Sequence, residues 1–66
     1  MNNVFVYCEI EGTTVAEVSQ ELLTKGRTLA NQLGVELHAL AVGTGIKGNV
    51  ENQILPYGVD KLFVFD

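Results

Sequence analysis

Three glycines with the spacing G-x-G-x-x-G, at Gly43, Gly45 and Gly48, form the motif with the clearest chemical meaning in this 66-residue sequence. In a strand–helix–strand unit, such glycines let the backbone approach a pyrophosphate, whose charge the helix N-terminus stabilises. An acid about 20 residues later binds a ribose hydroxyl, and Asp66 has that position. Two features count against this interpretation. The motif follows the second predicted strand instead of the first, and Pro56 limits the helix after it.

Cys8, Glu9 and His38 are the other side chains that could take part in chemistry. Cys8 and Glu9 end the first predicted strand, and ligands of open α/β sheets bind at that edge, so Glu9 is a weak candidate for cofactor binding. A thiol nucleophile needs a nearby base, and no histidine lies near Cys8 in the sequence, so we expect a buried structural thiol. His38 is expected to be a strand residue that is either packed or faces the edge of the sheet. We therefore predict no catalytic residues and no metal site.

The composition is that of a globular chain, with 47% hydrophobic and 18% charged residues. A formal net charge of −4 and only four scattered lysines and arginines argue against nucleic acid as a partner. No apolar run approaches the ~20 residues that a membrane helix needs, so no membrane insertion is expected. The N-terminus does not read as a targeting signal, and we expect a bacterial cytoplasmic protein.

The first half of the sequence predicts a strand followed by a helix. Residues 4–8 are rich in β-branched and aromatic residues and do not alternate with polar ones, which is typical of a strand buried on both faces. Thr14 and Glu17 have the spacing of a capping box, so the helix is expected to begin at Thr14, and Gly34 fits the position just past its end. Its buried face is expected to carry the residues spaced by three and four: Val15, Val18, Leu22, Gly26, Leu29, Ala30 and Leu33.

The second half repeats this order. Residues 37–42 are expected to form the second strand, Asn49 to cap a second helix, Pro56 and Gly58 to end it, and residues 62–65 to form the third strand. Alternating strands and helices indicate an α/β fold. The chain is therefore read as the βαβαβ portion of a doubly wound parallel sheet, Rossmann-like or adenine-nucleotide-hydrolase-like, and incomplete.

Four segments together resemble the amino-terminal part of the alpha subunit of electron transfer flavoproteins. Residues 4–9 look like that family's opening strand, which ends in a small residue and a glutamate. Residues 18–30 resemble its pattern S-x-E-L-L-x-x-A-R-x-L-A, and residues 33–40 resemble L-G-x-x-V-x-A-L. Residues 57–66 are close to Y-G-A-D-K-V-Y-V-x-D, the most specific of the four. Pro56 and the number of glycines in the 43–48 loop depart from the family pattern.

The resemblance implies a scaffold and subunit-interface segment of an FAD-containing heterodimer. Such heterodimers shuttle electrons between dehydrogenases and an acceptor, so the protein would be an electron carrier and not a catalyst. The FAD would be held mainly outside this segment, in the alpha subunit's carboxyl-terminal domain. The implied partners are the beta subunit and an acyl-CoA-type or other flavin dehydrogenase. Residues 1–66 would then be an amino-terminal fragment of the alpha subunit's amino-terminal domain, with no second domain present.

Two alternatives remain open on the sequence alone. One is a small nucleotide-binding βαβ module that uses the 43–48 loop, and the other is a universal-stress-like adenine-nucleotide domain with the same topology. In either reading the sheet is incomplete, so we expect residues 4–8 to present an open edge. An open edge of this kind is a template for association with another chain.

Overall fold

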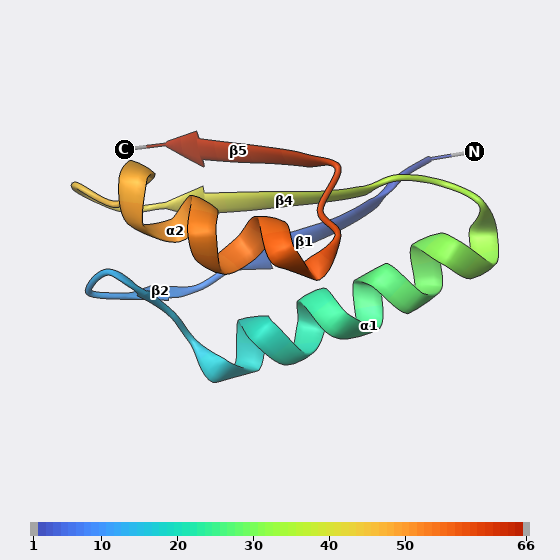
Figure 1. Ribbon diagram of the computed structural model, residues 1–66, viewed down its shortest axis with the longest axis horizontal. Helices are drawn as coiled ribbons and strands as arrows, with labels where there is room; N and C mark the ends of the chain where they lie inside the picture. The colour runs from blue at the N-terminus through green and yellow to red at the C-terminus, as the bar shows by residue number, and fades with distance from the viewer. Residues whose placement is uncertain (1, 66) are drawn as a thin grey trace.

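A three-stranded parallel sheet forms the centre of the molecule, in a computed structural model that describes residues 2–65. Its strands are β1 (Val4–Cys8), β4 (Leu37–Val42) and β5 (Lys61–Phe65), in the spatial order β1-β4-β5. Helix α1 (Glu17–Leu33) connects β1 to β4, and α2 (Lys47–Ile54) lies between β4 and β5. Figure 1 shows the three strands running in the same direction, as the sequence predicted for an incomplete parallel α/β sheet.

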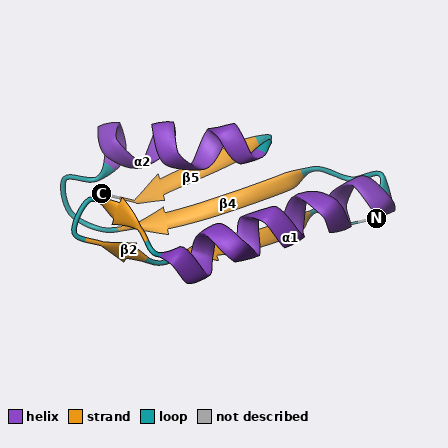
Figure 2. Cartoon of the chain, turned by 60° about the horizontal axis from the view of Figure 1, so that its bottom comes forward, coloured by secondary structure: helices purple, strands orange, loops and turns teal. Residues whose placement is uncertain are grey.

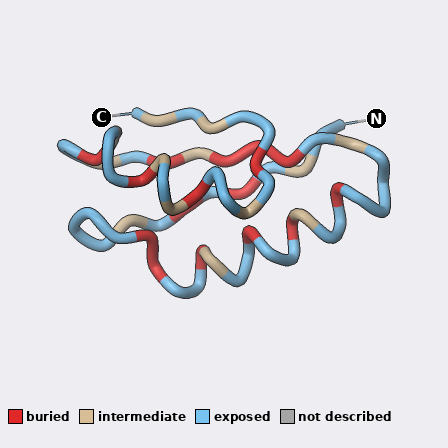
Figure 3. Tube along the Cα trace, in the orientation of Figure 1, coloured by how far each residue is buried: buried red, intermediate tan, exposed pale blue. Residues whose placement is uncertain are grey.

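Both helices pack on the same face of the sheet (Figure 2). Because side chains alternate along a strand, Val6 and Cys8 point towards the helices and are buried, whereas Phe5 and Tyr7 point to the opposite face. That opposite face, here called the open face, carries large apolar side chains that are 41–60% exposed: Phe5, Tyr7, Val42, Phe63 and Phe65. Figure 3 shows the buried residues gathered between the sheet and the helices. The apolar composition of the strands is typical of burial on both faces, and the two helices cover only one of them.

The start of α1 differs from the prediction. Thr14 and Val15 form strand β3 (Thr14–Val15), which pairs antiparallel with β2 (Ile10–Glu11), so Thr14 is not available as a helix cap. The helix begins at Glu17 after Ala16, without a side-chain capping bond, and the predicted capping box is wrong. Its end is as predicted, because Gly34 has the left-handed φ of 69° that a glycine after a helix accepts readily.

The buried face of α1 is displaced from the predicted one. Ser19, Leu23, Gly26 and Ala30 lie against the sheet. Four further helix residues were predicted to be buried but are 43–52% exposed: Val18, Leu22, Leu29 and Leu33. We call these four exposed residues the α1 stripe. Gly26 allows the close approach expected of it, since a Cβ there would lie 3.0 Å from methyl carbons of Leu37 and Val6.

Helix α2, in contrast to α1, begins earlier than predicted. It starts at Lys47 after Ile46, so Asn49 lies inside its first turn and is not its cap. It ends at Ile54, where the 3-10 helix η1 (Leu55–Tyr57) takes up Pro56, and Gly58 follows with φ 85°. The predicted end of the helix is therefore confirmed.

Candidate functional site at the carboxyl edge of the sheet

The carboxyl ends of the three parallel strands define the edge where ligands of open α/β sheets bind. Glu9 follows β1 there, and the loop that starts at Gly43 follows β4. The Gly43 backbone N–H donates a hydrogen bond of 3.0 Å to the carbonyl oxygen of Phe65 at the end of β5. The structure thus brings Glu9 and the glycine loop to one edge, as the sequence predicted. Asp66 lies outside the described residues.

The glycines of the 43–48 loop have different surroundings. A Cβ on Gly43 would lie 3.0–3.1 Å from carbons of Ile46, a residue that is only 1% exposed and fills the space beneath the loop. Gly45 has a φ of 67°, which other residues rarely adopt. Gly48 has open space where its Cβ would be, whereas the third glycine of a dinucleotide fingerprint packs a helix against a strand. The contact with Ile46 at Gly43 and the left-handed φ at Gly45 therefore account for the first two glycines without a phosphate.

Glu9 contributes its backbone to the docking of α1. Its N–H donates a hydrogen bond of 2.7 Å to Ser19 Oγ, and its carbonyl oxygen accepts one of 2.9 Å from the Ala16 N–H. The carboxylate itself is exposed. Ser19 is 1% exposed, so this bond satisfies a buried hydroxyl on the face of α1 that meets the sheet.

A hairpin of β2 and β3 extends from this edge, and the sequence analysis missed it. Glu11 pairs with Thr14, leaving Gly12 and Thr13 as a two-residue loop in which Gly12 has a φ of 65°. A glycine at the first of two central positions is a signal of such hairpins, and it was available in the sequence.

Gln53 of α2 holds the hairpin in place. Its Oε1 accepts a hydrogen bond of 2.8 Å from the Val15 N–H, and its Nε2 donates bonds of 2.8 Å to the Thr13 carbonyl and 2.9 Å to the Asn49 carbonyl. No sequence pattern distinguished Gln53, because the contact joins segments 38 residues apart.

Cys8 and His38 are packed residues, as predicted. Cys8 is fully buried, and burial raises the pKa of its thiol, which disfavours the thiolate. His38 is 9% exposed on the open face, where its ring meets those of Phe5 and Phe63 edge-on at centroid distances of 5.8 and 6.0 Å. Its Nε2 lies 2.8 Å from Glu36 Oε1, near the amino end of β4 and away from the candidate edge.

The amino end of the sheet holds the other polar cluster. Asp60 Oδ2 accepts a hydrogen bond of 2.8 Å from the Leu37 N–H and lies 3.3 Å from Arg27 Nη1. The backbone bond, with a smaller contribution from Arg27, lowers the pKa of the Asp60 carboxyl. The guanidinium also donates to the Gly58 carbonyl. These contacts join α1 to the η1–β5 turn and have a structural role.

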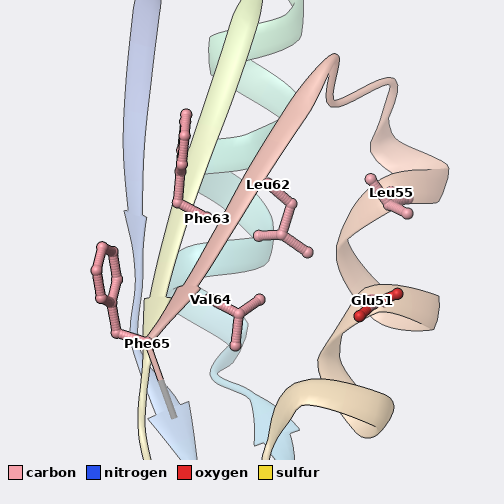
Figure 4. Close-up of a pocket in the computed structure, with 6 residues that line it drawn as sticks. All are labelled: Glu51, Leu55, Leu62, Phe63, Val64 and Phe65. Atoms are coloured by element: carbon pink, nitrogen blue, oxygen red, sulfur yellow. The ribbon is translucent and has the colours of Figure 1, made fainter.

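A groove runs between α2 and β5 (Figure 4). Leu62 and Val64 point towards α2, whereas Phe63 and Phe65 point to the open face. Among the described residues that line it, Glu51 is the only charged one, and these residues lack the converging polar groups of a catalytic pocket. Among residues 2–65, no group of three or more His, Cys, Asp and Glu side chains could hold a metal ion. In the same span, no helix has both the length and the apolar character needed to cross a membrane.

Comparison with known proteins identifies the family. The sequence matches the family described as "Electron transfer flavoprotein domain" over residues 4–66. It is 42% identical over 64 residues to "Lactate dehydrogenase (NAD(+),ferredoxin) subunit LctC" of Acetobacterium woodii, covering 96% of this chain and 15% of that protein.

Two further relatives have other names. Identity is 36% over 63 residues to "Electron transfer flavoprotein subunit alpha" of Clostridium acetobutylicum, covering 96% of this chain and 18% of the relative. Identity is 37% over 67 residues to "Protein FixB" of Rhizobium meliloti, covering 97% and 19%. The chain thus spans less than a fifth of the length of these relatives. Since the family match covers nearly the whole chain, the chain belongs to the electron transfer flavoprotein family, in which it corresponds to the amino-terminal part of the alpha subunit.

Proposed function

We propose that this chain is a scaffold and subunit-interface segment of an electron transfer flavoprotein alpha subunit. Its partner would be the beta subunit, and the FAD-containing heterodimer would carry electrons between an acyl-CoA-type or other flavin dehydrogenase and an acceptor. The segment itself would catalyse no reaction. A bacterial cytoplasmic location belongs to the same proposal.

The family match over residues 4–66 is the observation that carries this proposal. The surfaces of the segment support an interface role, because the open face and the α1 stripe expose large apolar side chains. Cys8 is buried as a neutral thiol, and His38 packs against two phenyl rings near the amino end of β4, so neither is placed for proton or electron transfer at the candidate edge.

The described residues do not fit a flavin site well. A dinucleotide such as FAD needs backbone N–H groups that a pyrophosphate can approach, yet the apolar Ile46 fills the space beneath the glycine loop and only Gly45 has the left-handed φ. The open face offers aromatic rings with few hydrogen-bonding groups beside them. The proposal therefore places the FAD mainly outside this segment.

An exchange experiment tests the proposal. Residues 4–66 of this chain would replace the matching segment of the Clostridium acetobutylicum alpha subunit, which would be produced together with that organism's beta subunit. We expect a heterodimer that retains FAD, seen by its flavin absorbance after size-exclusion chromatography, and that still accepts electrons from its dehydrogenase. The same chimera with Leu23→Asp, which places a carboxylate at a fully buried site, is the control for a misfolded segment. A folded chimera that fails to bind the beta subunit would contradict the proposal.

A further inference from the structure

The apolar pattern of β5 does not determine by itself where this strand pairs along β4. Leu62 and Val64 point towards α2 (Figure 4). Phe63 and Phe65 point to the open face. A shift of one residue along β4 would reverse these faces, but a shift of two would leave every side chain on the same face. In the observed register Phe63 lies opposite Leu40, and after a shift of two Phe65 would take that place. Contacts outside the strand pattern therefore select the register.

Asp60, just before β5, supplies such contacts. Its backbone N–H donates a hydrogen bond of 2.8 Å to the Leu37 carbonyl oxygen, and its carboxylate Oδ2 accepts one of 2.8 Å from the Leu37 N–H. Leu37 is fully buried, so its N–H needs a partner within the fold. In a parallel ladder that partner is a backbone carbonyl of the neighbouring strand. Because β5 begins only at Lys61, the Asp60 carboxylate takes the place of that carbonyl.

Arg27 of α1 holds the turn that leads into Asp60. Its guanidinium Nη1 donates to the Gly58 carbonyl oxygen and lies 3.3 Å from Asp60 Oδ2. Gly58 turns the chain with a φ of 85°, and a Cβ there would lie 2.8 Å from Arg27 Cδ. If β5 moved by two residues towards the amino end of β4, this turn would have to extend and leave Arg27. The bonds of Arg27 and Asp60 therefore oppose the same shift.

The register also affects the carboxyl end of the sheet. The Gly43 N–H, at the start of the glycine loop, donates its hydrogen bond to the Phe65 carbonyl, and a shift of two residues would carry that carbonyl away from it. We propose that Asp60, held by Arg27, is a positioning residue that fixes the register of β5 and thereby the start of the glycine loop. The candidate edge is thus set from the opposite end of the sheet, by two side chains that lie outside it.

Cysteine pairs on the open face measure the register directly. Leu40→Cys with Phe63→Cys joins residues that are opposite in the observed register, whereas Leu40→Cys with Phe65→Cys joins residues that are opposite after the shift of two. Both pairs are made in a Cys8→Ala chain, so that no third thiol competes, and the disulfide yields are measured by mass spectrometry after mild oxidation. Asp60→Ala should raise the yield of the second pair relative to the first by at least about fivefold, the effect of one lost hydrogen bond.

Hydrogen exchange gives a second measurement that needs no cysteines, in case a double-cysteine chain folds poorly. The Gly43 N–H reports the pairing of β4 with β5, and the backbone amides of β1 report the pairing on the other side of β4. Asp60→Ala should accelerate the exchange of the Gly43 N–H, relative to the β1 amides, by at least about fivefold. A general loss of stability would accelerate both groups by the same factor.

Three variants separate the positioning role from a loss of stability. Asp60→Asn keeps an oxygen acceptor for the Leu37 N–H, so it should keep the observed register. Val59→Ala removes methyl groups from a residue that is 8% exposed, so it should lower the free energy of unfolding without changing the ratio of the two disulfide yields. Arg27→Met keeps the aliphatic part of the side chain but removes its donors, and it should change the ratio in the same direction as Asp60→Ala.

Several results would overturn the proposal. If Asp60→Ala leaves the ratio of disulfide yields unchanged, the register does not depend on this carboxylate. If Val59→Ala changes the ratio as much as Asp60→Ala does, any loss of stability at this turn has the same effect. If Asp60→Asn behaves like Asp60→Ala, the bond to the Leu37 N–H is not what holds the strand. Equal acceleration of exchange at Gly43 and in β1 would assign Asp60 to overall stability alone.

Discussion

Two helical glycines, Gly26 and Gly48, have opposite surroundings, so the same substitution should have opposite effects at the two sites. Alanine in place of glycine in a helix gains about 1 kcal/mol of intrinsic propensity, less near a helix end. At Gly48, in the first turn of α2, nothing lies within 4 Å of the added Cβ. Gly48→Ala should therefore raise the free energy of unfolding by about 0.5–1 kcal/mol.

At Gly26 the added carbon would meet two buried methyl groups, each 3.0 Å away, on Leu37 and Val6. Both neighbours are packed in the core, at 0% and 7% exposure, so they can yield only if α1 moves away from the sheet. Overpacking costs about 1–3 kcal/mol, which offsets the gain in propensity. Gly26→Ala should lower the free energy of unfolding by about 0–2 kcal/mol.

The measurement is a pair of urea titrations followed by circular dichroism at one protein concentration, which is held fixed because association would shift the midpoint. The two variants should differ by about 0.5–3 kcal/mol, or roughly 2–24 °C in thermal midpoint for a domain of this size. If Gly26→Ala stabilises the chain as much as Gly48→Ala does, the close approach of α1 to the sheet is wrong.

Four other predictions follow from the site. Titration with FAD should give no stoichiometric complex tighter than about 10 µM, and a tighter one would contradict the scaffold role. Calorimetry with NAD, NADP and ADP should show no saturable binding. Binding that Gly45→Val abolishes and Asp66→Ala weakens would instead support the nucleotide-binding alternative. The folded state holds the pKa of the Asp60 carboxyl below its ordinary value of 3.8. The ionised carboxylate therefore stabilises the fold above that pH, and this stabilisation is lost as the pH falls through the lowered pKa. Asp60→Asn should make the free energy of unfolding depend less on pH in the acid range. The Cys8 thiol should react with Ellman's reagent only as fast as the chain opens, and a rapid reaction in native buffer would show that it is not buried.

The three strands of the parallel sheet were predicted well because their apolar runs are short and are bounded by glycine or polar residues. Residues 37–42 form β4 as predicted, and the last strand differs from the prediction by one residue, Lys61. The ends marked by Gly34, Pro56 and Gly58 were also predictable, since their conformational limits act locally.

The errors arose where tertiary contacts override a local pattern. Thr14 fits a capping box by spacing, but it pairs with Glu11, and the hairpin that results is held by Gln53 from a distant helix. Apolar or small residues spaced by three and four form two neighbouring rows along α1. Packing against the sheet determines which row is buried, and it is the one that contains Leu23. At the candidate edge, the sequence placed Glu9 and the glycine loop together but could not show that Ile46 fills the space beneath that loop.

The hydrogen bonds from Gln53 to the β2–β3 hairpin affect the order in which the chain can fold. A hairpin of two-residue strands is too short to persist alone in water, so its native form depends on an amide that arrives only when α2 has docked. The hairpin and α2 should accordingly open and close as one cooperative unit, although they lie on opposite sides of α1 in the sequence. In hydrogen exchange, the Val15 N–H, which bonds to Gln53 Oε1, would therefore report the docking of α2 and not the local stability of the hairpin.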